Sequence, residues 1–272
     1  MSFEVRAGDY GRFMGRYSAL LAGPFAGFAG VGVGRAALAA GFGVGRAADS
    51  GAGQRVLDVG CGTGELTAVL VARLGPASVA AVEPSSAFVE SARSRLPGVE
   101  IRQAPAEDLP FPGDAFDVTL AQLVVHFMTD PVAGLRSMAR VTRPGGVVAA
   151  CVWDHAGERG PLTVFWRAAR SLDPSVRGEA GLAGAREGHL AELFGAAGLR
   201  DVTSTILTVT SRYGNFEEWW EPYTLGVGPA GDHVRGLPPA RRDELRDRCA
   251  ALLPRHGPIA ITATAWAAKG RR

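Results

Sequence analysis

The stretch Val56–Leu66 most constrains what this chain can fold into. It reads Val-Leu-Asp-Val-Gly-Cys-Gly-Thr-Gly-Glu-Leu, so an apolar, β-branched run breaks into alternating glycines. Apolar residues at helical spacing follow at once, which predicts a strand, a tight turn and a helix. Glycine is required where a turn visits backbone conformations closed to other residues, or where a ligand approaches bare backbone. This order is typical of the first turn of a doubly wound α/β domain, in which ligands bind at the carboxyl ends of the strands.

The segments that follow keep the same alternation of strand and helix. Asp130-Pro131 can start a helix as N-cap and first-turn proline, and Arg143–Gly146 is expected to be a turn. The expected strands are 55–59, 78–83, 99–103, 116–122, 147–153, 202–210 and 259–267, and the helices between them are 65–74, 85–95 and 130–142. The predicted fold is therefore α/β: a Rossmann-like, doubly wound, seven-stranded sheet, mostly parallel, with an antiparallel last strand and helical insertions.

Outside this alternation, the chain divides into an N-terminal segment and two insertions. Residues 1–53 are expected to form a helical lid, with an amphipathic helix at 10–21, and a flexible Gly/Ala-rich connector with one short helix at 36–40. Residues 54–272 are expected to form the ligand-binding domain. Its helical cap insertions are placed at about 157–198 and 214–255, with helices at 161–172, 187–197, 216–224 and 239–253.

Composition narrows the class of protein. The chain has 272 residues, 47% of them hydrophobic, and a formal net charge of +2, which gives no reason to expect a nucleic-acid partner. The apolar region 20–48 is interrupted by proline, arginine and many glycines, so no membrane insertion is expected. Three scattered cysteines make no disulfide framework and favour a cytoplasmic location. No cluster has metal-ligand spacing, and self-association is left open.

The spacing of the glycines and two acidic residues indicate the ligand. Dinucleotide enzymes carry G-x-G-x-x-G and place a pyrophosphate on the helix N-terminus. Here the spacing is one residue tighter, and the carboxylate of Asp58 precedes the glycines, where it would oppose a diphosphate and suit an ammonium. Glu83 ends the second strand, where an acidic side chain can accept both hydroxyls of a ribose. A ribose and an ammonium without phosphate describe S-adenosylmethionine.

At this point the sequence resembles a known family. Residues 56–66 resemble the glycine motif of class I S-adenosylmethionine-dependent methyltransferases, and the ubiquinone/menaquinone-biosynthesis-like (methyltransferase type 11) branch matches best. The resemblance continues, in the same order, through 82–85 (Val-Glu-Pro-Ser), 103–112 (Gln-Ala-Pro-Ala-Glu-Asp-Leu-Pro-Phe-Pro), 115–118 (Ala-Phe-Asp-Val) and 143–146 (Arg-Pro-Gly-Gly). It implies an enzyme that uses S-adenosyl-L-methionine as its cofactor and methyl donor.

The resemblance implies a role for each matching position. The methionine end would be held by Asp58, Gly60, Cys61, Gly62 and Gly64, the ribose by Glu83 and Pro84, and the adenine by the backbone N–H of Ala106, while Gln122 would lie by the methionine end or the sulfonium. Pro105 stands where the family usually has Asp or Asn and removes the usual partner of the adenine amino group. Glu107 or Gln103 can substitute for it. Cys61 is interpreted as a small residue that fills the loop.

Residues after the fourth and fifth strands are expected to face a methyl acceptor. His126 is the candidate catalytic base, because a neutral imidazole can take a proton during methyl transfer. The alternatives for His126 are packing or orienting the acceptor, since transfer also proceeds by proximity and alignment alone. The expected acceptor pocket is Tyr10, Phe13, Tyr17, Trp153, His155 and Trp219.

The sequence favours methyl transfer to a small-molecule acceptor on O, C or N and leaves other functions open. A macromolecule methyltransferase that acts on exocyclic or amide nitrogen usually carries Asn/Asp-Pro-Pro-Tyr/Phe after the fourth strand, where this chain has Gln-Leu-Val-Val at 122–125. A cyclase-like protein that binds the cofactor without transferring its methyl group remains an alternative. A nicotinamide oxidoreductase is opposed by the glycine spacing and Asp58.

Overall fold

A seven-stranded sheet with strand order β3-β2-β1-β4-β5-β7-β6 forms the centre of the molecule. The computed structural model describes residues 7–32 and 53–272. The strands are β1 (Val56–Val59), β2 (Val79–Glu83), β3 (Glu100–Gln103), β4 (Phe116–Gln122), β5 (Thr142–Trp153), β6 (Arg200–Tyr213) and β7 (Ile259–Arg271). β1 to β5 pair in parallel, and β7 lies antiparallel between β5 and β6. The predicted fold class is confirmed.

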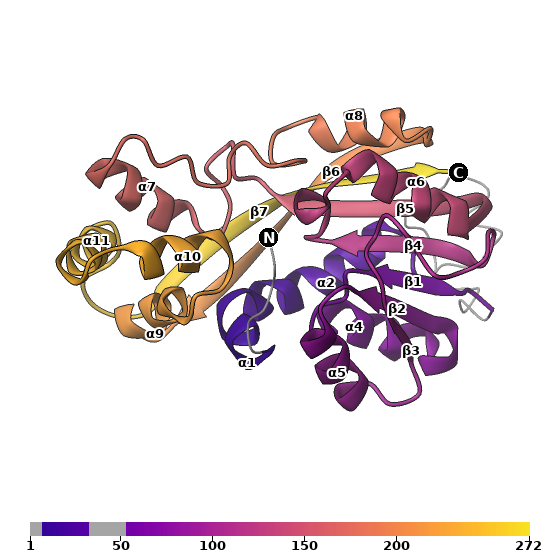
Figure 1. Ribbon diagram of the computed structural model, residues 1–272, viewed down its shortest axis with the longest axis horizontal. Coiled ribbons are helices and arrows are strands. Elements are labelled where there is room, and N and C mark those ends of the chain that lie inside the picture. The colour runs from indigo at the N-terminus through magenta and orange to yellow at the C-terminus, as the bar shows by residue number, and fades with distance from the viewer. Residues whose placement is uncertain (1–6, 33–52) are drawn as a thin grey trace.

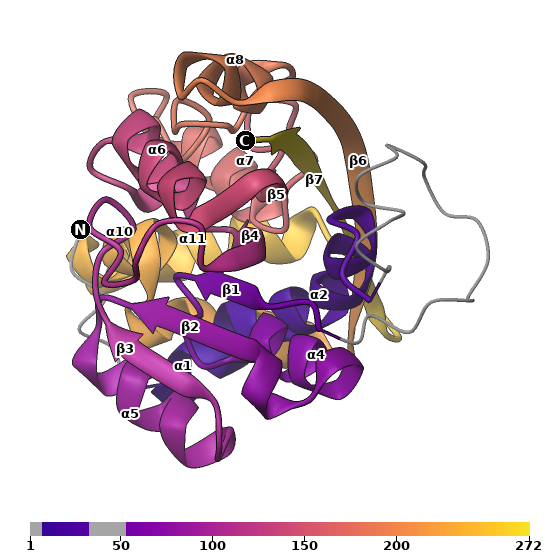
Figure 2. The same cartoon turned by 90° about the vertical axis from the view of Figure 1, so that its right-hand side faces the viewer.

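Helices cover both faces of the sheet because successive strand residues point to opposite sides. Val56 packs in one apolar cluster with helices α2 (Arg16–Phe28) and α4 (Glu65–Leu74), and its neighbour Leu57 packs in the other with α6 (Pro131–Val141) and α8 (His189–Ala196). α5 (Ser86–Arg95) packs on β2 and β3. Figure 2 shows α6 and α8 on one side of the sheet and α4 and α5 on the other.

The remaining helices gather at one end of the sheet (Figure 1). They are α7 (Thr163–Leu172), α9 (Phe216–Trp220), η4 (Glu221–Leu225), α10 (Gly228–Gly236) and α11 (Pro239–Ala251). The long strands β6 and β7 reach into this group, which is called the cap below. α1 (Ala7–Tyr10) lies near the same end. The short 3₁₀ turns η2 (Pro76–Ser78) and η3 (Val125–Phe127) follow α4 and β4.

The N-terminal helix is longer and less regular than predicted. It begins with α1, passes through a π-helical turn η1 (Gly11–Gly15), and continues as α2 beyond Pro24 to Phe28. Phe25 and Ala26 are fully buried, so packing against α4 and β6 extends the helix past the proline. Tertiary burial here outweighs the local preference for ending a helix near proline.

Three further expectations differ from the structure. The turn expected at 143–146 lies within β5, because Gly145 donates its N–H to the Arg272 carbonyl and Arg272 donates to the Gly146 carbonyl. β6 and β7 run longer than expected, paired from Arg200 to Tyr213. α10 was not predicted at all. The short helix expected at 36–40 and most of the connector lie outside the described residues.

Candidate active site

The glycine turn after β1 is shaped by close contact with the end of β4. β1 is buried along its whole length, and Gly60, Gly62 and Gly64 all have positive φ angles, of 71°, 55° and 91°. A Cβ atom at Gly60 would lie 2.5 Å from Cγ2 of Val124, so a side chain does not fit there. At Gly62 the nearest atom to such a Cβ would be Cε1 of Tyr10, at 3.9 Å. Gly62 therefore presents open backbone to a cavity.

Glu83 joins the glycine turn to the end of β2. Its carboxylate accepts hydrogen bonds from the N–H groups of Gly62 and Ser85, each at 3.0 Å. The N–H groups of Gly60 and Cys61 donate to the Val82 carbonyl at 2.8 and 2.9 Å. Burial raises the pKa of the Glu83 carboxyl, and the two N–H donors counteract this. The carboxylate is thus held rigidly at the strand end.

Asp58 is a buried acid within the same region. It is 1% exposed, and the Thr67 hydroxyl donates to its Oδ2 at 2.6 Å. Burial raises the pKa of the Asp58 carboxyl to about 7, and the negative charge of Glu83 adds to the rise. Asp58 and Glu83 lie at the end of one sheet and form no ion pair among the described residues, so a positively charged ligand would complement them.

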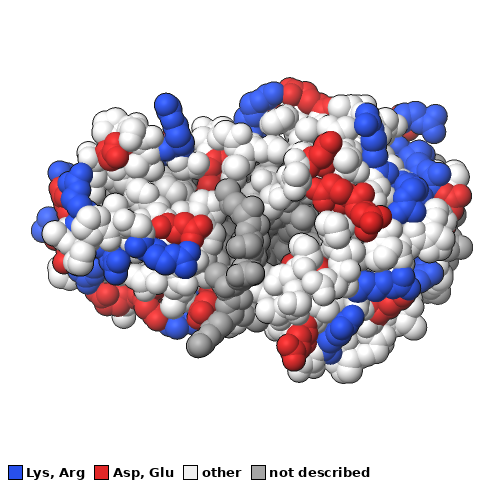
Figure 3. Space-filling view, in the orientation of Figure 1, with Lys and Arg blue, Asp and Glu red and all other residues white. Residues whose placement is uncertain are grey.

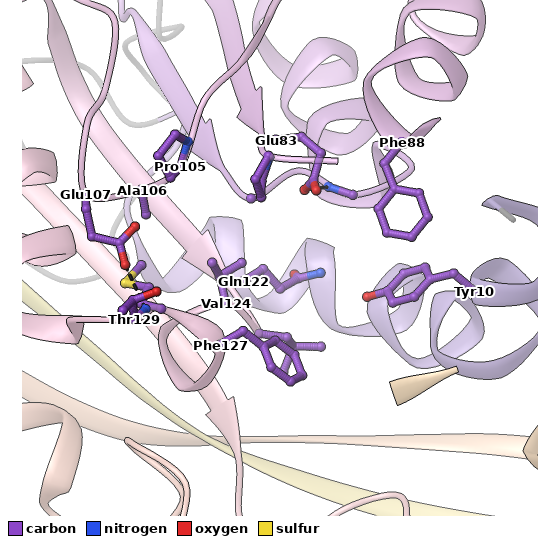
Figure 4. A pocket seen from close by; sticks show the side chains of 15 residues that line it. Tyr10, Glu83, Phe88, Pro105, Ala106, Glu107, Gln122, Val124, Phe127 and Thr129 are labelled. Carbon is purple, nitrogen blue, oxygen red and sulfur yellow. Dashed lines mark hydrogen bonds between the residues drawn. The ribbon is translucent and has the colours of Figure 1, made fainter. Parts of the chain in front are cut away.

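A cavity of about 250 Å³ lies beside these residues. Figure 4 shows Glu83 and Phe88 on one side of it, Tyr10 opposite Phe88, and Gln122 and Val124 between them and Glu107. The predicted donor-site residues that line it are Gly60, Gly62, Glu83, Pro84, Ala106, Glu107 and Gln122. Lining residues that sequence reasoning missed include Phe88, Val124, Phe127, Met128 and Thr129. Phe127 directly follows His126, so its position just after β4 could have identified it as a pocket residue from the sequence.

The three other predicted donor-site residues lie next to this cavity. Asp58 and Cys61 line a smaller cavity of about 20 Å³ that shares Gly60, Gly62 and Gln122 with the first. Gly64 packs toward Leu96, and a Cβ atom there would come within 2.7 Å of its Cδ1. Burial and the Asp58 carboxylate raise the pKa of the Cys61 thiol, so Cys61 is no activated nucleophile.

Two side chains offered as substitutes for the missing adenine partner are engaged elsewhere. Oε1 of Glu107 accepts the N–H groups of Thr129 and Asp130 at 2.8 and 3.3 Å, at the start of α6. Nε2 of Gln103 donates to the Pro84 carbonyl at 3.0 Å. Oε1 of Gln122 behaves differently, because it is buried and lacks a hydrogen-bond partner among the described residues, while its Nε2 donates to the Ser18 carbonyl.

A second cavity, of about 40 Å³, adjoins the first and shares Tyr10, Leu123 and Phe127 with it. Of the predicted acceptor-side residues, it is lined by Tyr10, Phe13, His126, Trp153 and His155. The cap and the loops next to its helices contribute Leu162, Glu179, Val227, Gly228 and Pro229, and η1 contributes Met14. Sequence reasoning identified none of these as pocket residues. The cavity is therefore enclosed by the strand ends, the N-terminal helix and the cap together.

Both histidines of this second cavity are neutral. Burial lowers the pKa of His126 to about 3, with a further contribution from His155, and burial lowers the pKa of His155 to about 4. The two ring centroids are 6.3 Å apart. Nδ1 of His126 is buried without a hydrogen-bond partner among the described residues. It can accept or donate one bond to a bound molecule, but it is a weak base.

Tyr17 and Trp219, expected in the acceptor pocket, line neither of the two larger cavities. Tyr17 is 2% exposed, receives a hydrogen bond from the Tyr213 hydroxyl at 2.7 Å, and packs edge-on against Trp153. Trp219 is 1% exposed and packs on Tyr223. Both belong to the aromatic core between sheet and cap.

The residues of the first cavity and of the small cavity that adjoins it fit S-adenosylmethionine. The open backbone at Gly62, the two buried acids and the unpartnered Oε1 of Gln122 complement an ammonium, a ribose and a sulfonium. In the part of the chain that the structure describes, no group of His, Cys, Asp and Glu side chains could hold a metal ion. No helix in that part is long and apolar enough to cross a membrane.

Residues 57–150 match the family described as "Methyltransferase domain". The chain is 42% identical over 100 residues to 2-methyl-6-phytyl-1,4-hydroquinone methyltransferase 2 of Oryza sativa, covering 36% of this chain and 28% of the rice protein. It is 43% identical over 101 residues to the ubiquinone/menaquinone biosynthesis C-methyltransferase of Vibrio vulnificus, covering 35% and 39%. The matches thus span well under half of these relatives.

Solved structures share the fold over more of the chain. A putative methyltransferase of Bacillus halodurans aligns with a TM-score of 0.51 at 16% identity, over 80% of this chain and 92% of that one. A protein of Thermotoga maritima, described as an S-adenosylmethionine-dependent methyltransferase and possible histamine N-methyltransferase, aligns with a TM-score of 0.50 at 17% identity, over 97% and 99%. At these identities the likeness shows the fold alone. Residues 57–150 therefore match a methyltransferase domain, and the chain around them has the fold of these two solved structures.

Proposed function

We propose that the protein transfers the methyl group of S-adenosylmethionine to a small-molecule acceptor bound in the second cavity. The observation that carries this proposal is the adjacency of the two cavities, which share Tyr10, Leu123 and Phe127. One is lined by the donor motifs, and the other is enclosed by aromatic side chains and two neutral imidazoles. A donor and an acceptor held side by side in this way need little more than alignment to react.

The donor-side residues have distinct roles in this proposal. Asp58 and the glycine turn bind the methionine end, with Cys61 and Gly64 shaping the turn. Glu83 and Pro84 hold the ribose, the Ala106 N–H faces the adenine, and Oε1 of Gln122 faces the sulfonium end. When bound, the cofactor supplies a methyl group made electrophilic by the positive sulfur. Water exclusion by Tyr10 and Phe88, whose rings lie 5.3 Å apart, strengthens the electrostatic contacts.

His126 orients the acceptor in this proposal and does not serve as its main base. With a pKa of about 3, its imidazole stays neutral at pH 7 and takes up a proton poorly. Nδ1 of His126 and Nε1 of Trp153 are buried and have no hydrogen-bond partner within residues 7–32 and 53–272, so both are suited to hydrogen-bonding an acceptor. Catalysis then rests mainly on proximity and alignment.

The size and charge of the site support a small acceptor rather than a macromolecule. The second cavity is about 40 Å³ and lies beneath the cap. On the face shown in Figure 3, arginine and lysine side chains are interspersed with acidic ones and form no continuous basic band. A nucleic-acid substrate would call for such a band.

The match to the methyltransferase family ends at residue 150, before the helices of the cap begin. Leu123, His126 and Phe127 of the second cavity lie within residues 57–150, whereas its other lining residues lie outside that range. In this proposal residues 1–53 act as a lid and connector, and the insertions at about 157–198 and 214–255 form the acceptor side of the domain at 54–272. The chain's own cap therefore selects the substrate.

Two measurements test the proposal. Isothermal titration calorimetry should show binding of S-adenosylhomocysteine to the wild-type protein. Incubation with methyl-labelled S-adenosylmethionine and a panel of quinols, phenols and amines should then transfer label to at least one of them. Binding of S-adenosylhomocysteine with no transfer to any acceptor class would instead support a cyclase-like role, and no binding would refute the proposal.

A further inference from the structure

One acidic side chain in the second cavity has no role in the proposed donor site. Glu179 lies in the loop between α7 and α8, is 5% exposed and lines this cavity. Nε1 of Trp166 donates to its Oε2 at 2.8 Å. This is the one hydrogen bond that its carboxylate makes among residues 7–32 and 53–272. Burial raises the pKa of Glu179 to about 7, so near neutral pH the cavity holds a carboxyl group that is partly charged.

The described residues supply no cation to this carboxylate. The arginines of the neighbouring helix α7, Arg167 and Arg170, both pair with Glu158. Arg159 pairs with Asp154. Because a buried carboxylate without a cation is costly, the arrangement persists at the expense of stability, which is common where a ligand completes a site.

The surroundings of Glu179 favour one kind of complement. The cavity walls are the aromatic side chains of Tyr10, Phe13, Phe127 and Trp153. Aromatic faces attract cations, most strongly where water is excluded. The neutral imidazoles of His126 and His155 add no positive charge that would repel one. A carboxylate among aromatic rings and neutral imidazoles is a suitable site for a protonated amine.

We propose that Glu179 is the specificity-determining residue of the acceptor cavity and that it binds a basic nitrogen, so that the acceptor is a compact amine-bearing molecule. This inference rests on the proposed function, because it assigns the acceptor of the same site. A hydroxyl acceptor would leave the buried charge uncompensated, whereas an ammonium forms a charge-assisted hydrogen bond with it. Because the cavity is small, it accommodates only the nitrogen-bearing end of such an acceptor.

The charge of Glu179 can be separated from its structural contact. In Glu179→Gln, the amide oxygen can still accept the hydrogen bond from Trp166, so folding is preserved while the negative charge is lost. Glu187→Gln is the matched control, because Glu187 is exposed in the same loop. The probes are isosteric pairs, benzylamine with benzyl alcohol and 2-phenylethylamine with 2-phenylethanol, titrated by calorimetry with saturating S-adenosylhomocysteine.

Wild-type protein and Glu187→Gln should bind each amine at least about 10-fold more tightly than its alcohol, the ratio expected when one charge-assisted hydrogen bond is gained. Glu179→Gln should lose this preference. If no amine is favoured over its alcohol, or if Glu179→Gln keeps the preference, the inference is refuted. The affinity for S-adenosylhomocysteine is measured separately in each variant. If the wild-type protein binds S-adenosylhomocysteine but does not prefer amines, only this inference is refuted. If the wild-type protein does not bind S-adenosylhomocysteine, the proposed function is refuted.

Discussion

Replacing Asp58 by asparagine should stabilise the protein at alkaline pH while weakening donor binding. The folded protein holds this carboxyl with a pKa of about 7, raised mainly by burial from its ordinary value of 3.8. The protonated Asp58 contributes its full share of the unfolding free energy below the pKa that the carboxyl has in the unfolded chain. This contribution is lost as the pH rises through the pKa in the folded protein. An asparagine stays neutral throughout, and its amide oxygen can still accept from the Thr67 hydroxyl.

The size of this stability difference follows from the difference between the pH of the measurement and the pKa of Asp58 in the folded protein. Between pH 5 and pH 7 the wild-type protein loses about 1.4 kcal/mol of unfolding free energy per pH unit relative to Asp58→Asn. The advantage of the variant should therefore grow by about 3 kcal/mol between pH 5 and pH 8, or roughly 6 to 12 °C in Tm for a domain of this size class.

The assay is thermal and denaturant unfolding at pH 5 and pH 8 without ligand, combined with calorimetric titration of S-adenosylhomocysteine at pH 8. Glu90→Gln, which removes an exposed carboxylate on α5, is the control for a change of net charge. An Asp58→Asn advantage that does not change between the two pH values would refute the assignment of the titrating group. Unchanged donor affinity at pH 8 would refute the role of Asp58 in binding the ammonium.

Three further predictions concern the donor turn and His126. Glu83→Ala should weaken S-adenosylhomocysteine binding at least about 10-fold in calorimetry, because hydrogen bonds to a charged group are worth about 1.5–3 kcal/mol; unchanged affinity would contradict the ribose assignment. Gly60→Ala should destabilise the protein by about 2–5 kcal/mol, because a positive φ costs about 1–2 kcal/mol and overpacking against Val124 about 1–3 more. Gly188→Ala, at a left-handed φ of 77° where the nearest atom to the new Cβ would be Oε1 of Glu192 at 3.9 Å, should lose only the first part in the same denaturant titration. Between pH 6 and pH 8, the pH profile of acceptor turnover should have the same shape in the wild-type protein and in His126→Asn, since the pKa of His126 is about 3. An inflection that is present in the wild-type protein and absent from the variant would show that His126 is a base.

Local sequence was sufficient for the central fold. The run Val56–Val59, apolar apart from Asp58, forms the strand that its pattern predicts. The alternating glycines after it predict the tight turn whose positive φ angles the structure shows. The predictions failed where packing over distance decides. α2 continues past Pro24 because Phe25 is buried against other elements, and residues 143–146 join β5 because the C-terminal Arg272 pairs with them.

The acceptor side was much less predictable. Aromatic residues of the N-terminal helix and the cap look alike in sequence, yet Phe13 lines the second cavity while Tyr17 and Trp219 are held in the core. The spacing of apolar residues predicts which face of a helix is buried. Which segment packs against that face depends on parts of the chain that are distant in sequence. Glu179 lies in a loop without a recognisable pattern, so no local signal marked it.

The sequence by itself determined where the candidate donor-site residues lie, because each of them is in a short turn or at the end of a strand. Asp58, the glycines and Glu83 meet at one sheet edge as soon as β1 and β2 pair in parallel. Only the tertiary structure decided the charge states and the acceptor cavity. Burial raises the pKa of Asp58 and Glu179 and lowers that of His126, and burial depends on which distant segments pack over each side chain.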